Sequence, residues 1–99
     1  MNKNESFSFL AVDLGATSGR AILGTIKNDV LKINEINRFP NPIIDINGYL
    51  YWDLLYLYRQ ILKSFDEINQ QRIDIHSLGI DTWGVDFVCF GNDGEPLRM

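Results

Sequence analysis

The sequence predicts an α/β fold, with a mixed sheet of about five strands, one long helix and a small β-ribbon. Three observations support this class. Short apolar runs joined by brief polar connections occupy residues 7–39, as in an antiparallel meander. An Asn-Gly pair at 47–48 lies between apolar residues, which is a strong hairpin signal. Between 53 and 69, apolar residues recur at steps of three and four, which is helical spacing.

Three strands are predicted at the start of the chain, at 7–13, 20–27 and 30–39. The first contains a continuous apolar run at 10–12 and is expected at the centre of the sheet, covered on both faces. Asn28-Asp29 has turn chemistry. The apolar alternation slips at Glu35-Ile36, which indicates a bulge or a strand end. Pro40 and Pro42 stop the third strand, because proline cannot continue a central ladder.

The ribbon is expected at 44–51, and Asp53 is expected to cap the following helix, since its carboxylate can accept from first-turn amides. The predicted apolar face of this helix, widened by two further leucines, consists of Leu54, Tyr58, Ile61, Phe65 and Ile68 with Leu55 and Leu62. The helix should end near Asn69. Two more strands follow at 77–81 and 85–90, then a turn at 91–94. The strand after the helix should pair parallel with the first strand through a right-handed crossover.

Length and composition set broad limits on function. The 99 residues suffice for about one small domain, and 45% hydrophobic with 22% charged residues indicates a globular chain. A net charge of −4 without any Lys/Arg run argues against a nucleic-acid partner. It does not argue against a phosphate ligand, because backbone amides can bind anions without side-chain cations.

Cellular location is predicted from segments that the sequence lacks. Cys89 is the single cysteine, which favours a reducing compartment and excludes an intrachain disulfide. The N-terminus has no signal-peptide core, and no run approaches the roughly 20 apolar residues of a membrane span. We therefore expect a cytoplasmic protein that does not bind membranes. With one helix for two sheet faces, we also expect the front end of a larger protein, with an uncovered face that favours self-association.

The stretch DLGATSGR at 13–20 carries more chemistry than a hairpin turn requires. A glycine-rich turn can point successive N–H groups into a concavity that binds anionic oxygens. Gly15 and Gly19 tolerate positive φ and allow close ligand approach, and the Thr-Ser pair between them adds hydroxyl donors. Asp13 beside a phosphate implies an intervening cation, for which water-bridged Mg²⁺ is expected. The alternative is an ordinary hairpin with solvated polar residues.

A second polar cluster interrupts the apolar stretch GIDTWGVDF at 79–87. Gly84 permits a bend and a close ligand approach. Trp83 offers a flat apolar surface that suits the C–H face of a sugar, and Asp81 and Asp86 can accept hydrogen bonds from hydroxyls. The alternative is a packed tryptophan at a strand corner with two solvated acids.

These stretches resemble a known family. DLGATSGR is similar to the phosphate-binding hairpin of the sugar-kinase, Hsp70 and actin superfamily, whose fold is ribonuclease-H-like. With NRFPNPIIDINGYLYWD at 37–53 and GIDTWGVDF, the chain closely resembles the start of bacterial rhamnulokinases, within the FGGY carbohydrate kinase family. The resemblance extends from residue 11 to residue 94.

The resemblance implies ATP-dependent phosphorylation of L-rhamnulose at its 1-hydroxyl, with Mg²⁺, in L-rhamnose degradation. It places Asp13 at the metal and Gly84 at the substrate. The ATP-phosphate contacts that it implies are Ala16, Thr17, Ser18, Gly19 and Arg20. The wider superfamily commonly has threonine where this chain has Ala16, so only the backbone amide can contact phosphate at that position.

The resemblance also implies that residues 1–99 are the N-terminal portion of the first FGGY kinase domain. The catalytic aspartate and the adenosine pocket then lie outside these residues, and the second domain is absent. Because phosphoryl transfer depends on positioning across a closed cleft, we expect no kinase activity from this chain alone.

Three alternatives stay open at this point. The first is a kinase for another sugar of the same family, such as fuculose. The second is a non-catalytic nucleotide-binding regulator, although the few residues before the first strand are not basic. The third is a β-rich interaction domain, in which the glycine-rich loop has no ligand. Nucleotide binding separates the third alternative from the kinase.

Overall fold

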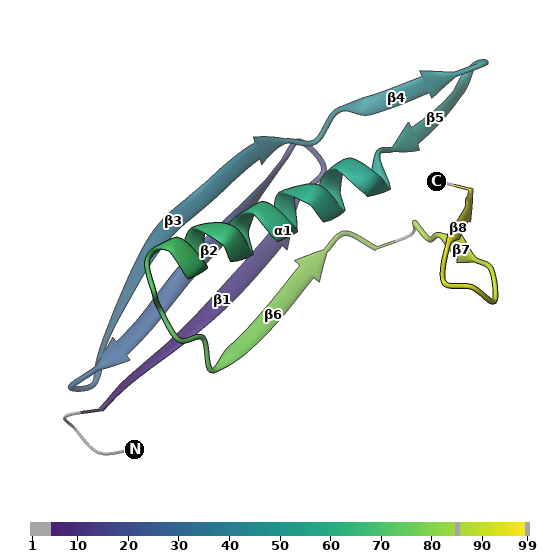
Figure 1. Cartoon of the computed structure of the whole chain (residues 1–99). Helices are drawn as coiled ribbons and strands as arrows, with labels where there is room; N and C mark the ends of the chain where they lie inside the picture. Colours follow the sequence, from purple (N-terminus) through teal and green to yellow (C-terminus); the bar gives the residue numbers. More distant parts are fainter. Residues whose placement is uncertain (1–4, 85, 99) are drawn as a thin grey trace.

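The computed structural model describes residues 5–84 and 86–98 of the chain. In chain order, its strands and helix are β1 (Ser6–Leu14), β2 (Ser18–Lys27), β3 (Val30–Pro40), β4 (Ile43–Ile46), β5 (Tyr49–Trp52), α1 (Leu54–Gln70), β6 (Ser77–Thr82), β7 (Cys89–Phe90) and β8 (Pro96–Arg98) (Figure 1). No helix in the described part of the chain is long and apolar enough to cross a membrane.

The main sheet has four strands in the order β3-β2-β1-β6. β1 is antiparallel to β2 and parallel to β6, so the sheet is mixed, as predicted. The predicted strand at 85–90 is wrong for most of its length. Residues 86–88 have no regular structure, and only Cys89–Phe90 is a strand, paired with β8 in a separate ribbon. Val85 lies outside the described residues.

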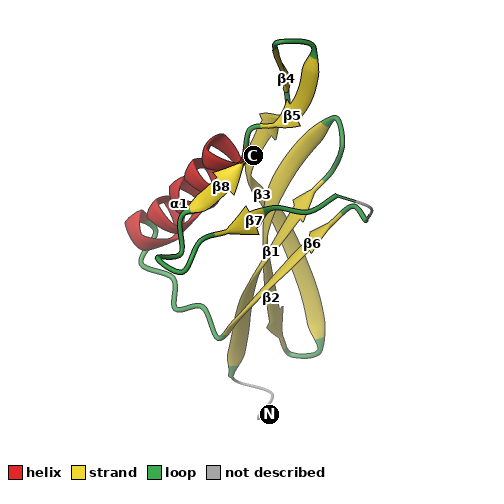
Figure 2. Cartoon of the chain, turned by 90° about the vertical axis from the view of Figure 1, so that its right-hand side faces the viewer, coloured by secondary structure: helices red, strands yellow, loops and turns green. Residues whose placement is uncertain are grey.

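The hydrophobic core lies between α1 and one face of the sheet, and Figure 2 shows the helix on one side of the strands. Because successive strand residues face opposite sides, β1 and β2 present alternate residues to the helix. These core residues are Leu10, Val12, Ala21 and Leu23, with Ile68 of α1. β1 is central, as predicted. Coverage of both its faces was a wrong expectation for the described residues, because α1 is their only helix and lies on one face.

The helix begins and ends close to the predicted positions, but its buried face differs. Asp53 caps it by accepting a hydrogen bond from the Tyr56 N–H at 3.0 Å. The fully buried positions are Leu57, Ser64 and Ile68, whereas three predicted face residues are 42–59% exposed: Leu55, Tyr58 and Leu62. Ser64 occupies the centre of the true face because its hydroxyl donates to the Gln60 carbonyl and accepts from Asn37. Because a serine lies at the centre of the buried face, the spacing of apolar residues did not identify that face.

The predicted turns and the bulge are confirmed. Asn47 and Gly48 join β4 to β5 with φ of 54° and 83°, and Asn28 and Asp29 join β2 to β3 with φ of 54° and 61°. Positive φ at both central residues matches the twist of hairpin strands. Between β2 and β3 the register passes over Ile36, which is the extra residue of a bulge.

Candidate functional site

The loop between β1 and β2 is the predicted phosphate-binding turn. The strand pairing reaches Leu14 opposite Gly19, and the Gly15 N–H donates to the Ser18 carbonyl at 3.0 Å. Ala16 and Thr17 are exposed, and within the described part of the chain their N–H groups have no hydrogen-bond partner. The loop therefore offers two free amides. The Gly15 amide, which the predicted nest included, is not free because it donates within the hairpin.

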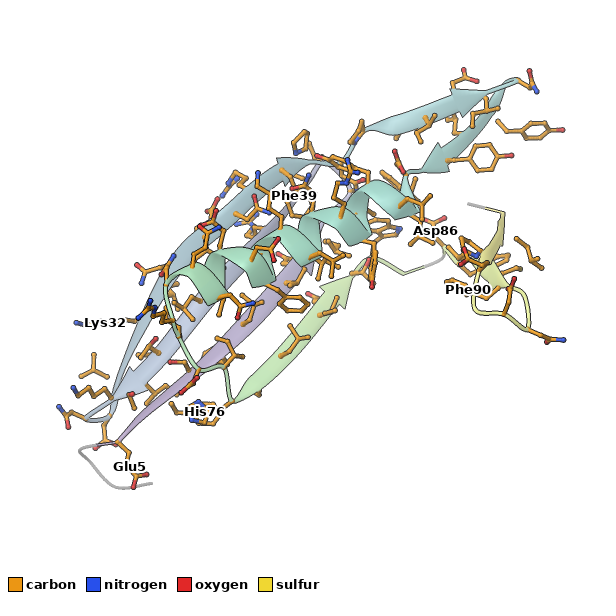
Figure 3. The ribbon with its side chains drawn as sticks, in the orientation of Figure 1. Glu5, Lys32, Phe39, His76, Asp86 and Phe90 are labelled. Carbon is orange, nitrogen blue, oxygen red and sulfur yellow. The ribbon has the colours of Figure 1, made fainter. Side chains whose placement is uncertain are left out.

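Glycine is required in this loop for space and not for a positive φ. The described glycines with positive φ are Gly48 and Gly94, so that part of the sequence interpretation was wrong for Gly15 and Gly19. A Cβ on Gly15 would lie 2.8 Å from the Ser18 carbonyl oxygen. A Cβ on Gly19 would lie 2.3 Å from the ring of Phe39, which packs between β3 and α1 (Figure 3). The groups that approach these two glycines closely are therefore the Ser18 backbone and the Phe39 ring of the chain itself, and not a ligand.

Asn41, which follows β3, is hydrogen-bonded to two carbonyl groups of the loop. This contact was not predicted from the sequence. The backbone N–H of Asn41 donates to the Thr17 carbonyl at 3.0 Å, and its Nδ2 donates to the Gly15 carbonyl at 2.9 Å. The side chain is buried. The available signal was an asparagine between two prolines, which we interpreted only as the end of a strand.

Asp13 and Arg20 face each other across β1 and β2, on the side of the sheet away from α1. The Arg20 Nε lies 3.8 Å from Asp13 Oδ2, and Asp81 is the β6 neighbour of Asp13. In the described residues, no group of three or more His, Cys, Asp or Glu side chains is placed to hold a metal. Mg²⁺ often uses one or two carboxylates with water and other oxygen ligands, so the single carboxylate of Asp13 is chemically compatible with such an ion.

A cavity of about 400 Å³ is lined in part by Leu14, the last residue of β1 before the loop. Its walls come from β5, the start of α1 and the segment after β6, and they are mainly aromatic and aliphatic. Asp86 Oδ2 accepts hydrogen bonds from the indole N–H groups of Trp52, at 2.9 Å, and Trp83, at 2.6 Å. The two indole rings lie 4.6 Å apart with an interplanar angle of 50°. Figure 3 shows Asp86 near the first turn of α1.

The loop and the cavity share one end of the sheet. Leu14 and Thr82 are neighbours in the parallel pairing of β1 with β6, and both line the cavity. Gly15, the next residue after Leu14, begins the loop. A ligand with an anionic group and a small polar body could therefore contact both features at once.

Other predicted residues are placed differently. Asp81 lies on the sheet face opposite Thr82, so it does not share the cavity with Asp86. Gly84 is an exposed bend beside the cavity, and a Cβ there would meet nothing within 4 Å. His76 lies at the other end of the sheet, where it exchanges hydrogen bonds with the Ser8 backbone (Figure 3). Trp52 belongs to the site because its indole N–H donates to Asp86, which is 34 residues away in sequence.

One ion pair shifts the ionisation of its members, and it lies on β3 outside this site. Arg38 donates to both carboxylate oxygens of Glu35, at 2.6 and 3.0 Å. These hydrogen bonds lower the pKa of Glu35 below its ordinary value and raise the pKa of Arg38.

Comparison with known proteins identifies the relatives of this chain. No family model matches it. It is 53% identical over 92 residues to a rhamnulokinase from Bacteroides thetaiotaomicron. The aligned residues make up 93% of the chain and 19% of that protein. The chain is 47% identical over 90 residues to a rhamnulokinase from Oceanobacillus iheyensis, covering 91% and 19%, respectively. The chain is homologous to rhamnulokinases. It spans about a fifth of the length of the curated relatives it matches, and the resemblance inferred from the sequence is confirmed.

A third rhamnulokinase, from Mannheimia succiniciproducens, is 44% identical over 89 residues, which are 88% of the chain and 18% of that protein. The loop, Asn41, the tryptophan pair and Asp86 all belong to a chain of which about nine-tenths is aligned with rhamnulokinases.

Proposed function

We propose that this chain supplies the phosphate-binding loop and one wall of the sugar site of an ATP-dependent kinase that acts on L-rhamnulose. The observation that carries the proposal is the adjacency of a loop with two free amides to an aromatic cavity containing a carboxylate, in a chain homologous to rhamnulokinases. Phosphate and sugar must meet in a kinase, and these two features meet at Leu14 and Thr82.

The loop suits the terminal phosphates of ATP. The free N–H groups of Ala16 and Thr17 can donate to phosphate oxygens, as backbone amides do in anion-binding turns. The hydroxyls of Thr17 and Ser18 add donors on the same segment. Gly19 keeps the turn close to Phe39, and Arg20 adds a positive charge beside Asp13.

Asp13 is the proposed metal-associated residue. A carboxylate next to phosphate is repelled unless a cation lies between them, and Mg²⁺ would supply that positive charge. Arg20 at 3.8 Å partly offsets the charge of Asp13, so the acid can remain near a nucleotide. Water molecules would complete the coordination, because Mg²⁺ dehydrates reluctantly.

The cavity suits the ketose. Both indole hydrogen bonds go to Asp86 Oδ2, which leaves Oδ1 for a sugar hydroxyl. The indole rings of Trp52 and Trp83 offer apolar surface for the C–H face of a sugar ring or chain. Gly84, beside this cavity, is the proposed backbone contact to the substrate, and the absence of a side chain there leaves room for it.

For the whole enzyme we propose a ribonuclease-H-like fold, in which residues 1–99 form the N-terminal portion of the first FGGY domain. The 1-hydroxyl of L-rhamnulose would accept the γ-phosphoryl group, with the catalytic base supplied by other parts of the full-length protein. The 99-residue chain should therefore release no ADP in response to rhamnulose in a coupled assay. Rhamnulose-dependent ADP release by this chain alone would contradict that division of roles.

Binding by the chain tests the two half-sites separately. Millimolar MgATP should shift the amide resonances of residues 15–19 saturably, and Asp13→Asn should weaken the magnesium dependence of that shift. Trp52 and Trp83 are the only two tryptophans in the sequence, so tryptophan emission, excited selectively over the four tyrosines, reports on the cavity. L-rhamnulose should change this fluorescence, and L-fuculose should change it less. Silence toward both ligands would favour an interaction domain, whereas a stronger response to fuculose would indicate a different sugar kinase.

A further inference from the structure

We propose that Asn41 is the positioning residue of the phosphate loop: its two donors fix the orientation of two loop peptides, one of which carries the free Ala16 amide that is proposed to meet the nucleotide. This inference rests on the proposed function of the loop at 15–17. Asn41 does not face a phosphate itself, and its effect passes through the Gly15 and Thr17 carbonyls.

The argument begins with peptide geometry. In a trans peptide, the carbonyl and the following N–H point in opposite directions, and no cis peptide occurs in the described residues. The Gly15 carbonyl points to Asn41 Nδ2 at 2.9 Å, so the Ala16 N–H points away from Asn41. Likewise, the Thr17 carbonyl points to the Asn41 N–H at 3.0 Å, which turns the Ser18 N–H away. Two alternate peptides of the loop thus share one orientation.

Asn41 itself is held rigidly. It is 5% exposed, Pro42 restricts its backbone, and Pro40 before it has a fixed φ of its own. Pro40 is the β3 residue opposite Ser18, so the asparagine begins where the ladder ends. A donor on such a fixed segment selects one loop conformation before the ligand arrives, which lowers the ordering cost of binding.

The unused oxygen of the side chain supports the same interpretation. Asn41 Oδ1 is buried and finds no hydrogen-bond partner among residues 5–84 and 86–98. A buried unpaired oxygen destabilises the fold, and an apolar side chain of similar size would avoid that cost. What asparagine offers here, and leucine does not, is the bond that Nδ2 donates to the Gly15 carbonyl.

The test compares Asn41→Leu with Asn37→Leu in the 99-residue chain. Asn37 is the matched control, because it is a partly buried asparagine of β3 whose Nδ2 donates to Gln60 and Ser64 of α1 and not to the loop. Dissociation constants for MgATP come from the amide shifts of Ala16 and Thr17, with thermal unfolding measured for each variant. We expect roughly tenfold weaker binding for Asn41→Leu and less than about twofold for Asn37→Leu.

A second variant guards against misfolding and adds a readout that a structural role would not move. The carboxylate of Asn41→Asp cannot donate to the Gly15 carbonyl, but its protonated form can. Relative to the wild-type chain at each pH, MgATP binding by Asn41→Asp should therefore recover on acidification, whereas that of Asn41→Leu should not.

The outcomes separate the two proposals. Weak binding confined to the Asn41 variants supports the positioning role. Equal binding by the Asn41 and Asn37 variants, or no recovery of Asn41→Asp on acidification, overturns it and leaves the nucleotide site in place. No binding by the wild-type chain overturns the proposed function of the loop and the inference with it.

Discussion

Gly19→Ala is expected to be among the most destabilising glycine substitutions in the sheet. The new Cβ would lie 2.3 Å from Cε2 and 2.4 Å from Cζ of Phe39, far inside van der Waals contact. Phe39 cannot easily move aside, because it is 3% exposed and its ring meets the edge of Tyr56 at a centroid distance of 6.2 Å. Overpacking of this kind costs about 1–3 kcal/mol, and the confinement of the ring places Gly19→Ala near the upper end.

Two other glycines provide an internal scale. A Cβ on Gly24 would lie 2.2 Å from the Phe9 ring, but Phe9 is half-buried on the open face of the sheet and can swing outward. Gly24→Ala should therefore cost about 1 kcal/mol. A Cβ on Gly79 meets nothing within 4 Å, so Gly79→Ala should be neutral or stabilising by roughly 0.5 kcal/mol through lower unfolded-state entropy.

The assay is urea unfolding followed by far-UV circular dichroism, with free energies compared at constant m-value. For a domain whose total stability is about 5–15 kcal/mol, a loss of about 3 kcal/mol in Gly19→Ala should lower Tm by roughly 12–24 °C. The order Gly19, Gly24, Gly79 is the essential result. If Gly19→Ala unfolds at the same urea concentration as Gly79→Ala, Phe39 is not held against the loop.

Three further predictions concern the helix cap, the core and the surface ion pair. Asp53→Ala should reduce the free energy of unfolding by about 1 kcal/mol, seen in the urea midpoint, because the first-turn amide of α1 loses its acceptor. Leu10→Ala should cost about 3 kcal/mol, whereas Leu31→Ala, with 57% of Leu31 exposed, should stay within about 0.5 kcal/mol of the wild-type chain. The lowered pKa of Glu35 means that its pair with Arg38 stabilises the chain above the ordinary glutamate pKa and loses this effect as pH falls through the lowered value. Glu35→Gln should therefore shift the urea midpoint at neutral pH and not in acid. The shift should be small because both groups of the pair are exposed.

Local signals in the sequence predicted local structure well. Asn47-Gly48 specified the β4–β5 ribbon, Asp53 the start of α1, and the slip at Ile36 the bulge in β3. Each depends on a backbone requirement that a few neighbouring residues reveal.

Contacts between distant segments explain what was missed. Ser64 faces the sheet because Asn37 of β3 supplies a hydrogen-bond partner. The apolar pattern alone therefore predicted the wrong side of the helix as the buried face. The strand predicted at 85–90 is replaced at 86–88 by a corner where Asp86 accepts from Trp52 and Trp83. Of the candidate site, the loop and the tryptophan corner were predictable, whereas Asn41 and Trp52 join it through partners 26 and 34 residues distant.

The two outer strands of the main sheet differ in how they meet solvent. β3 carries a bulge and the charged side chains of Lys32, Glu35 and Arg38, which discourage pairing with another chain. β6, in contrast, is short and uncharged except for Asp81, with Leu78 and Ile80 47% and 54% exposed. Concentrated solutions of this chain should therefore form dimers by strand addition at β6 and leave β3 unpaired, and a lysine introduced at Leu78 should keep the chain monomeric in sedimentation experiments.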